Sequence, residues 1–351
     1  MNDNHLFFFT NKEKLGFINE QLPSVEVTLT TSQVDDQEAW LKQRTAGIGG
    51  SDVGAICGLS HFECARGIYL KKTGQYPEEE LSDFQKDLFH FGHVLEATVA
   101  SEYYLRTGNR LFDAGVSFRS KKEPWKLANV DRFILDDQDN IVGILEVKTT
   151  SEFNNNDWKE GNIPPSYLAQ LNWYMHVLDI QWGAICVLVG GNKFYYYDVF
   201  RNDEWLESKL LPVVDTFWNH NVKNLIEPEL DDSDAAEELV KKMYPADKAK
   251  EERLELLDES TDSMLNQLDS IKGQIKSLEK DKKRIETAIK DRLGDSIYAS
   301  TLSYDISWKP QKQVRIDTTR LRVERPDLFE EFSKEISFKK LSIKVLPEDD
   351  E

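Results

Sequence analysis

Two short segments rich in β-branched and apolar residues, 126–135 and 141–149, lie on either side of a strongly polar run at 136–140. Each apolar segment predicts a strand. The run Asp-Asp-Gln-Asp-Asn between them is typical of a turn. Together the three segments predict a β-hairpin.

The register of this hairpin brings charged residues together. If Asp136 pairs with Ile141, the antiparallel register places Asp131 opposite Glu146. Side chains on a strand alternate between its two faces, so Glu146 and Lys148 share one face while the apolar residues beside them point to the other. We therefore expect two carboxylates and one ammonium to converge on one patch.

Helical periodicity precedes the hairpin, over residues 82–107. Ser82 is a suitable N-cap, Gly108 follows the last turn, and Glu96 lies near the margin of the apolar stripe. The residues expected to form that buried stripe are Phe89, Val94, Leu95, Val99 and Tyr103.

A second amphipathic helix is predicted at 166–178, where Gln170 and Tyr174 lie one turn apart on the same side. Two strands and a further helix follow, at 182–189, 193–200 and 202–221. The order of helix, strands, helix, strands and helix indicates an α/β (α+β) fold in which helices flank a mixed sheet.

Apolar residues then recur at alternating spacings of three and four, which predicts one long heptad helix ending at Gly294, about 60 Å in length. Its seam comprises Leu254, Leu257, Thr261, Met264, Leu268, Ile271, Ile275, Leu278, Lys282, Ile285 and Ile289. Two kinds of partner fit such a seam. One is intramolecular, either the short segment 235–243 or a face of the preceding domain, and the other is a second copy of the chain.

The last part of the chain predicts a small α+β module. We expect paired strands at 297–308 and 313–316, short helices at 318–323 and 326–333, and a last strand at 336–345.

The net charge of −19 argues against a protein that coats DNA regardless of sequence, because such binding depends on neutralising phosphates with Lys and Arg. Basic residues are nevertheless frequent in the first half of the chain. A nuclease needs positive charge only in its DNA-binding cleft, so these residues could supply it although the whole chain is acidic. They are Arg44, Arg66, Lys71, Lys72, Arg119, Lys121, Lys122 and Lys126.

Cysteine spacing and hydropathy predict a location in the cytoplasm. The three cysteines have no metal-type CxxC spacing and are expected to be reduced packing residues. No apolar run is long enough to span a bilayer, and the polar start lacks the basic region of a signal peptide.

The patch around Asp131 has the chemistry of a metal site. Buried like-charged carboxylates repel unless a cation neutralises them, and an all-oxygen site suits Mg²⁺, with Mn²⁺ as a substitute. Such an ion activates water beside a phosphodiester while a lysine stabilises developing negative charge, which indicates hydrolytic phosphoryl transfer. The alternative is a solvated hairpin face that carries an ordinary surface salt bridge.

The motifs in this order resemble the PD-(D/E)xK nuclease superfamily, and within it the phage-type exonuclease branch that includes lambda exonuclease and the YqaJ-like viral recombinases. The resemblance covers about residues 39–221, including an upstream segment, 44–53, that is similar to that branch's N-terminal signature. Its other motifs are Gly92-His93-Val94-Leu95-Glu96, Val130-Asp131, Glu146-Val147-Lys148, and Gln170 with Tyr174. The family often has proline before the metal aspartate, where this chain has Asn129-Val130.

The resemblance implies a role for each matching residue. Asp131 and Glu146 would bind the metal directly, Val147 through its backbone carbonyl, and Glu96 through water. Lys148 would be the catalytic lysine.

Four further residues take roles from the same resemblance. Gln170 would lie near the attacking water or the DNA backbone, and Tyr174 would pack and hydrogen-bond on the same helix. Arg44 and Ser51 match positions that grip a terminal 5′-phosphate, beside a glycine turn whose N–H groups can approach an anion.

The implied activity is a Mg²⁺-dependent 5′ to 3′ exonuclease that acts on ends of double-stranded DNA and leaves 3′ single-stranded tails. Its implied partners are a single-strand annealing protein and further copies of the chain in a ring, with no membrane, in the cytoplasm of a bacterial host. Two other functions remain open: an endonuclease on the same core, and a catalytically silent DNA-binding or scaffold protein.

We accordingly expect five segments. They are an N-terminal extension (1–38), a nuclease domain (39–226), an acidic linker with a short helix (227–252), a long heptad helix (253–294) and a small α+β module with an acidic tail (295–351).

Overall fold

The computed structural model describes residues 11–29, 42–77, 82–251 and 259–344. The chain divides into two compact units, Met1–Tyr244 and Pro245–Glu351. The predicted acidic tail and the first two seam residues, Leu254 and Leu257, lie outside the described residues.

The first unit is built on a five-stranded sheet. Its strands, in spatial order, are β2 (Arg110–Phe112), β5 (Arg132–Leu135), β6 (Ile141–Thr150), β7 (Trp182–Val189) and β8 (Lys193–Phe200). The pair β6 and β7 is parallel and the other three pairs are antiparallel. The predicted mixed sheet is confirmed.

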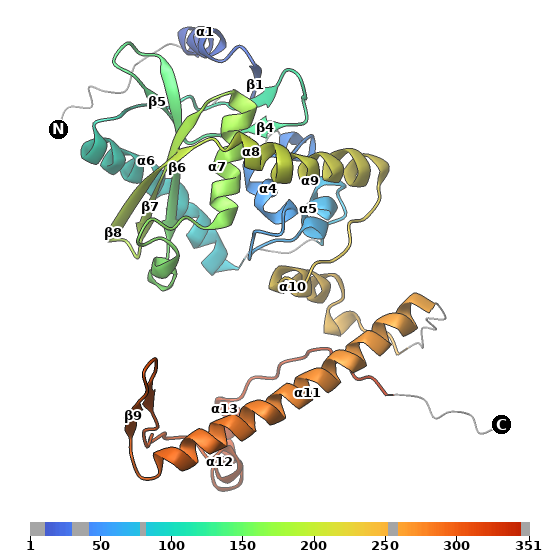
Figure 1. Cartoon of the computed structure of the whole chain (residues 1–351). Helices are drawn as coiled ribbons and strands as arrows, with labels where there is room; N and C mark the ends of the chain where they lie inside the picture. The colour runs from blue at the N-terminus through green and yellow to red at the C-terminus, as the bar shows by residue number, and fades with distance from the viewer. Residues whose placement is uncertain (1–10, 30–41, 78–81, 252–258, 345–351) are drawn as a thin grey trace. The chain divides into compact units, whose positions relative to one another are not determined.

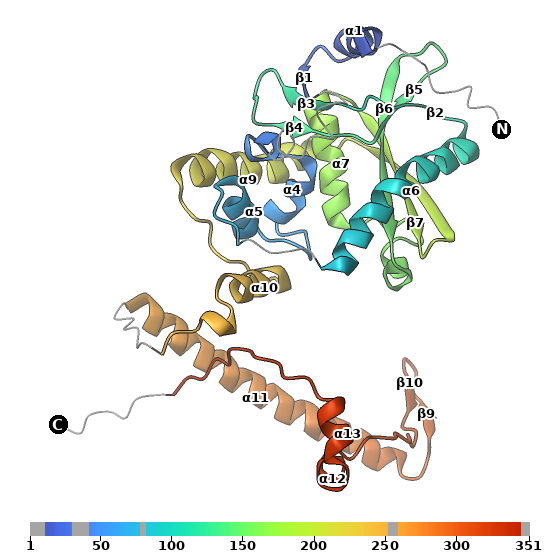
Figure 2. The same ribbon diagram turned by 180° about the vertical axis from the view of Figure 1, so that it is seen from behind.

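Helices cover both faces of this sheet (Figures 1 and 2). On one face, α6 (Asp83–Thr107) packs against β6 and β7. On the other lies α7 (Pro165–Leu178), the connection between these two parallel strands. Behind α7 pack α4 (Gly50–Ile56) and then α5 (Ala65–Lys72).

The hairpin of β5 and β6 forms with one irregularity. Arg132 pairs with Leu145, but the register shifts near the turn, so that Leu135 rather than Asp136 pairs with Ile141. The predicted turn pairing is therefore wrong by one residue. Because the shift lies at the turn end, the register at the far end still places Asp131, just before β5, opposite Glu146.

The predicted single strand over 126–135 is wrong. Its first part is β4 (Leu127–Ala128), which pairs with β3 (Ser117–Ser120). That strand in turn pairs with β1 (Val25–Leu29), in a separate three-stranded sheet. Residues 129–131 connect the two sheets, because β4 pairs with β3 whereas the second part of the predicted strand, β5, pairs with β2 and β6.

Helix α6 begins and ends where the sequence predicts. Ser82 accepts a hydrogen bond from the backbone of Gln85, and Gly108 adopts a left-handed conformation, with φ 75°. Its predicted buried stripe is only half correct, because Phe89 and Val94 are 62 % and 52 % exposed. Only the C-terminal half of the helix packs into the cluster beneath the sheet, through Val99, Ala100 and Tyr103.

The predicted helix at 202–221 is confirmed as a helical run in four parts: α8 (Asp203–Trp205), a π-helical turn (Leu206–Leu210), α9 (Leu211–Thr216) and a second π-helical turn (Phe217–Val222). The unit ends with α10 (Asp234–Met243). Its apolar residues Ala235, Ala236 and Leu239 are buried in the main core. The first described element of the chain is helix α1 (Asn11–Gln21).

The second unit contains the long predicted helix, α11 (Glu259–Leu293). A small hairpin follows, β9 (Tyr298–Ser300) and β10 (Asp305–Ser307), and then α12 (Thr318–Glu324) and α13 (Pro326–Glu331).

The predicted pairing of 297–308 with 313–316 is wrong. A turn at Thr301, whose hydroxyl accepts the N–H of Tyr304, folds the first segment back on itself. The predicted last strand is also absent over its described part, 336–344. Its backbone pairs with no neighbouring strand there.

The described cysteines, Cys57, Cys64 and Cys186, are all free thiols, and the latter two are buried. No helix in the described ranges is both long and apolar enough to cross a membrane.

Candidate active site

Strand β6 presents Glu146 and Lys148 to helix α7. The Nζ of Lys148 lies 2.6 Å from Oε1 of Glu146, and the Nε2 of Gln170 donates to the same oxygen at 2.6 Å. Glu146 is 2 % exposed. The neighbouring Leu145 and Val147 point to the opposite face and pack in the cluster beneath α6. The predicted alternation along this strand is confirmed.

Asp131, the residue just before β5, joins the cluster. Its Oδ2 accepts the backbone N–H of Val147 at 2.7 Å, which orients the carboxylate toward β6. Burial and then the charge of Glu146 raise the pKa of Asp131 well above its usual range, and Glu96 adds to the effect. The carboxylates are therefore close enough to repel one another strongly.

Lys148 supplies the local positive charge. Burial alone would lower the pKa of Lys148, but the charges of Glu146 and Asp131 outweigh it and hold the pKa above its ordinary value. The ammonium also lies 5.0 Å from the centre of the Tyr167 ring, a cation–π distance. The two carboxylates thus favour the protonated, positively charged form of Lys148.

Glu96 is held at the edge of this cluster by a residue that sequence reasoning missed. The Nη1 of Arg132 lies 2.7 Å from Oε1 of Glu96, and its Nη2 lies 3.5 Å from Asp113. Arg132 directly follows Asp131, but 36 residues separate it from Glu96, so the sequence carries no local signal for this pairing. The third carboxylate therefore faces a guanidinium rather than the other two.

The donor set fits a hard divalent cation at Asp131 and Glu146. The second oxygen of Glu146, Oε2, is buried without a hydrogen-bond partner in the described part of the chain. A buried carboxylate oxygen of this kind is costly unless a cation binds it. Within those same residues no three His, Cys, Asp or Glu side chains are gathered as a metal site. Glu96, the third predicted carboxylate, is paired with Arg132.

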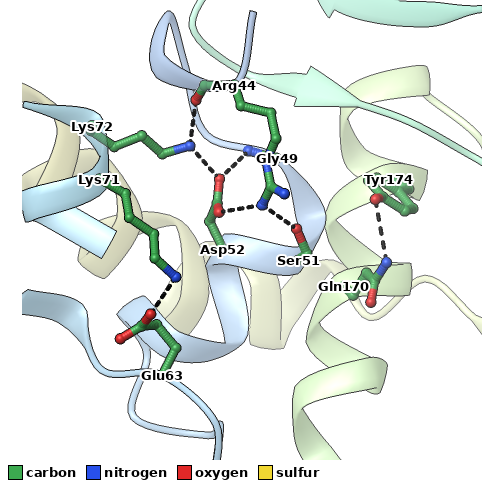
Figure 3. Close-up of polar contacts among 9 residues, drawn as sticks. All are labelled: Arg44, Gly49, Ser51, Asp52, Glu63, Lys71, Lys72, Gln170 and Tyr174. Atoms are coloured by element: carbon green, nitrogen blue, oxygen red, sulfur yellow. Dashed lines mark hydrogen bonds and ion pairs between the residues drawn. The ribbon is translucent and has the colours of Figure 1, made fainter. Parts of the chain in front are cut away.

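Helix α7 carries the other predicted residues. Gln170 donates to the hydroxyl of Tyr174 at 3.3 Å (Figure 3). It also donates to Glu146, as described above. Burial raises the pKa of Tyr174 well above its usual range, so its hydroxyl stays protonated. A Cβ on Gly50 would lie 2.5 Å from the Tyr174 ring and 3.0 Å from Gln170. Gly50 thus lets α4 pack closely on the active-site helix.

Replacing Gly50 with alanine should lower the free energy of unfolding by about 2 kcal/mol, because the added methyl group overpacks the contact with Tyr174. The matched control is Gly16→Ala in α1, where no atom lies within 4 Å of the new Cβ. That change should raise stability by about 0.5–1 kcal/mol. Urea unfolding measures both, and equal effects of the two substitutions would contradict this account of Gly50.

The start of α4 carries Ser51 and Asp52, a buried acid that sequence reasoning missed, and Arg44 reaches both from the segment before the helix (Figure 3). The carboxylate of Asp52 lies 3.3 Å from Nη2 of Arg44 and 2.6 Å from Nζ of Lys72. Arg44 also donates to the hydroxyl of Ser51 at 3.3 Å. The N–H of Gly49, expected to face an anion, donates instead to Asp52 at 3.0 Å.

Asp52 is a fixed negative charge. Burial alone would raise the pKa of Asp52, but the charges of Lys72 and Arg44 outweigh it and hold the pKa below its ordinary value. Asp52 is the third residue of α4, and its carboxylate accepts the N–H of the N-cap residue Gly49, which is one half of a capping box; glycine has no side chain to supply the other half. This acid ties Arg44 to the helix that packs on α7.

Several of the predicted basic residues are engaged within the protein. Lys126 is buried between Glu123 and Asp215, and Lys72 pairs with Asp52. Others form ion pairs nearer the surface: Arg66 with Glu227, Lys71 with Glu63, and Arg119 with Glu26.

Comparison with known proteins decides the family. Residues 39–181 match the model of the YqaJ-like viral recombinase domain. The protein named YqaJ from Bacillus subtilis (strain 168) is 36 % identical over 321 residues, which cover 91 % of this chain and 97 % of that relative. This chain belongs to the YqaJ-like viral recombinase family. The resemblance predicted from the sequence motifs is confirmed.

Two solved structures show more distant likenesses to this YqaJ-like chain. The alkaline exonuclease LHK-Exo from Laribacter hongkongensis is 16 % identical, with a TM-score of 0.42, over 54 % of this chain and 95 % of that one. A phage-related exonuclease from Haemophilus somnus 129PT is 10 % identical, with a TM-score of 0.36, over 51 % of this chain and 96 % of that one.

Family membership and the carboxylate–lysine cluster together assign this YqaJ-like protein to the deoxyribonucleases, the enzyme class predicted from the sequence. Asp131, Glu146, Lys148 and Gln170 lie together, and Glu96 lies beside them through Arg132. Arg44 and Ser51 form a second group at the start of α4.

Proposed function

We propose that this protein is a divalent-metal-dependent exonuclease that degrades the 5′-ended strand of duplex DNA and leaves a 3′ single-stranded tail. The observation that carries the proposal is the buried cluster of Asp131, Glu146 and Lys148, in which one oxygen of Glu146 has no partner among the described residues. Mg²⁺ is the proposed cofactor, with Mn²⁺ as a substitute, because all the donors are hard oxygens.

The proposed metal ligands are Asp131 and Glu146 directly and the backbone carbonyl of Val147. Glu96, which pairs with Arg132 at 2.7 Å, would bind the metal through water. When bound, the ion polarises the phosphodiester and lowers the pKa of a bound water.

Two residues of the chain orient the reaction. Lys148 keeps its proton, so it serves as a fixed positive charge beside the phosphate and stabilises the negative charge that develops on its oxygens. Gln170 donates to Oε1 of Glu146, which leaves Oε2 as the oxygen that would bind the cation. Tyr174 supports Gln170 from the next turn of α7.

Arg44 and Ser51 are the proposed ligands of the terminal 5′-phosphate. A guanidinium can form two parallel hydrogen bonds to phosphate oxygens. Asp52 and Lys72 act as positioning residues, because the Asp52 carboxylate holds Arg44, and Lys72 also contacts the backbone oxygen of Arg44. Gly50 joins this group to α7 through its contacts with Tyr174 and Gln170.

We further propose a single-strand annealing protein as the partner that receives the 3′ tail, and a ring of copies that retains the enzyme on DNA, in the cytoplasm of a bacterial host. The support for these partners is the family, one of viral recombinases. With a net charge of −19, the protein needs a local positive site or enclosure to stay on DNA.

A strand-labelled duplex tests the proposed polarity and dependence on ends. With Mg²⁺, the protein should shorten only the 5′-ended strand of linear DNA and leave a covalently closed circle intact. A 5′-phosphate should be preferred over a 5′-hydroxyl, and Arg44→Ala should reduce that preference by about tenfold, the effect of about 1.4 kcal/mol from one charged contact.

The outcomes separate the alternatives. Opening of the closed circle would show an endonuclease. No hydrolysis with Mg²⁺ or Mn²⁺ would favour a silent DNA-binding protein, and loss of the 3′-ended strand would refute the polarity.

A further inference from the structure

The second unit exposes far more apolar surface than a stable monomeric domain. Over its described residues, 245–251 and 259–344, Leu293 is the one buried apolar side chain. Residues as large as Leu278 and Phe332 are 67 % and 79 % exposed. A unit of this size that buries no core is not expected to be stable alone. It requires a partner surface.

The apolar surface of α11 is organised as a seam. Starting from Thr261 as position a of a heptad, positions a and d follow one face of the helix to Ile289. The helix has 35 residues and is about 52 Å long. The seam side chains Met264, Ile271, Ile275, Leu278 and Ile285 are each at least half exposed. A seam of this kind is covered by another helix of similar length.

The short intramolecular helix does not supply that surface. The apolar residues of α10, Ala235, Ala236 and Leu239, are already packed in the core of the first unit. At 10 residues it is also much shorter than α11.

The distribution of charge along α11 favours pairing with α11 of a second copy, with the two helices antiparallel. Residues 259–271 carry Glu259, Asp262 and Asp269 and no basic side chain. Residues 272–293 carry eight basic and four acidic side chains. In an antiparallel pair each acidic half lies on the basic half of the other helix, whereas a parallel pair sets like charges together.

We propose that α11 pairs with α11 of a second copy in an antiparallel coiled coil. With the helices fully overlapped, each a position faces a d position of the partner. Leu268 then faces Ile285 of the partner subunit, and Ile275 faces Leu278 of the partner subunit. The second copy thus buries the apolar seam that the isolated unit exposes.

The polar residues of the seam agree with this direction. Lys282 occupies an a position. In a parallel pair this lysine would face the same lysine of the partner helix, so two like charges would be buried together. In the antiparallel pair it faces Ile271 of the partner subunit, and its ammonium can reach solvent. Arg292 lies beside the acidic first turn of the partner helix. This arrangement therefore avoids buried like-charge contacts.

The mass of the full chain in solution tests the pairing. Ile275→Lys places a charge on the seam, and we expect it to halve the mass measured by light scattering at the same protein concentration. Ser277→Lys adds the same charge two residues away, outside the seam. The mass of this variant should equal that of the wild type. Circular dichroism of each variant checks that α11 remains helical.

The halving is expected when α11 is the contact that joins the two copies, or two assemblies of the first unit. A wild-type chain with the mass of one copy, 40.6 kDa, would overturn the proposal. An unchanged mass in Ile275→Lys, or an equal loss in Ser277→Lys, would also overturn it.

Disulfide cross-linking tests the direction. Leu268→Cys and Ile285→Cys are prepared separately in the full chain, mixed, allowed to exchange subunits and oxidised. The mixture should form disulfide-linked dimers, while each variant alone should not form them beyond the level of the wild type, which carries Cys57, Cys64 and Cys186. Dimers from each variant alone would show parallel helices.

These tests do not depend on the proposed nuclease activity, because mass and cross-linking are measured without DNA or metal. Failure of the coiled coil would leave the active site untouched, and an inactive enzyme would leave the coiled coil untouched.

Discussion

Replacing Lys148 with methionine should reduce hydrolysis of duplex DNA by about a thousandfold, the typical effect of removing a group that stabilises charge in the transition state. The Nζ of Lys148 is the cation 2.6 Å from Glu146, and methionine keeps most of the side-chain volume without the charge. Single-turnover hydrolysis of a labelled linear duplex at saturating Mg²⁺ measures the effect.

The same substitution should destabilise the metal-free protein. Without the ammonium, the buried Glu146 keeps only Gln170 as a partner, and no positive charge offsets its repulsion with Asp131. Breaking a buried ion pair by removing one partner costs about 3 kcal/mol.

The control is Lys86→Met, at an exposed ion pair with Asp83 on α6, which should change neither activity nor stability appreciably. Activity of Lys148→Met within tenfold of the wild type would refute the catalytic role of this lysine.

Replacing Asp131 with asparagine should also reduce hydrolysis by about a thousandfold, but with the opposite effect on stability. The amide oxygen of asparagine can still accept the N–H of Val147, so the local geometry is kept. Removing one of two buried like charges should stabilise the metal-free protein by about 1–3 kcal/mol near neutral pH. The variant should also lose the stabilisation that Mg²⁺ confers on the wild type.

The pH dependence of stability follows from the raised pKa of Asp131. Because the folded-state pKa lies above the ordinary value of 3.8, the stability linked to this carboxyl is complete below that value and is lost as pH rises through the folded-state pKa. The metal-free wild type should therefore lose stability over that range relative to Asp131→Asn.

Thermal unfolding in the presence of EDTA and then of Mg²⁺, repeated at several pH values, measures these differences. An asparagine variant that is less stable than the wild type at neutral pH without metal would contradict the buried repulsion. A Mg²⁺-dependent shift of the same size in both proteins would place the metal elsewhere.

The active-site hairpin was predictable because its information is local. The polar run at 136–140 predicted the turn, and strand alternation predicted that Glu146 and Lys148 would share a face. The error of one residue at the turn did not matter, because an irregularity between Ile134 and Leu135 absorbs it before Asp131 is reached. Periodicity likewise predicted the helices that carry Glu96 and Gln170.

The partners of the site residues were not predictable in the same way. Nothing near Glu96 in the chain indicates that Arg132 will hold it, since 36 residues separate them. The pairing of Asp52 with Lys72 depends on how α4 packs beside α5, and the exposure of Phe89 and Val94 depends on how far α6 extends along the sheet. Each depends on the packing of separate elements.

The sequence by itself determined the main helices, the active-site hairpin, the family motifs and the chemistry of Asp131, Glu146 and Lys148, because periodicity, turn composition and side-chain type are properties of short segments. Only the tertiary structure decided that one oxygen of Glu146 is buried without a partner among the described residues, that Glu96 faces a guanidinium, and that Arg44 is anchored by a buried acid. Burial and pairing arise only when distant segments pack together, and they set the energies of the charged groups.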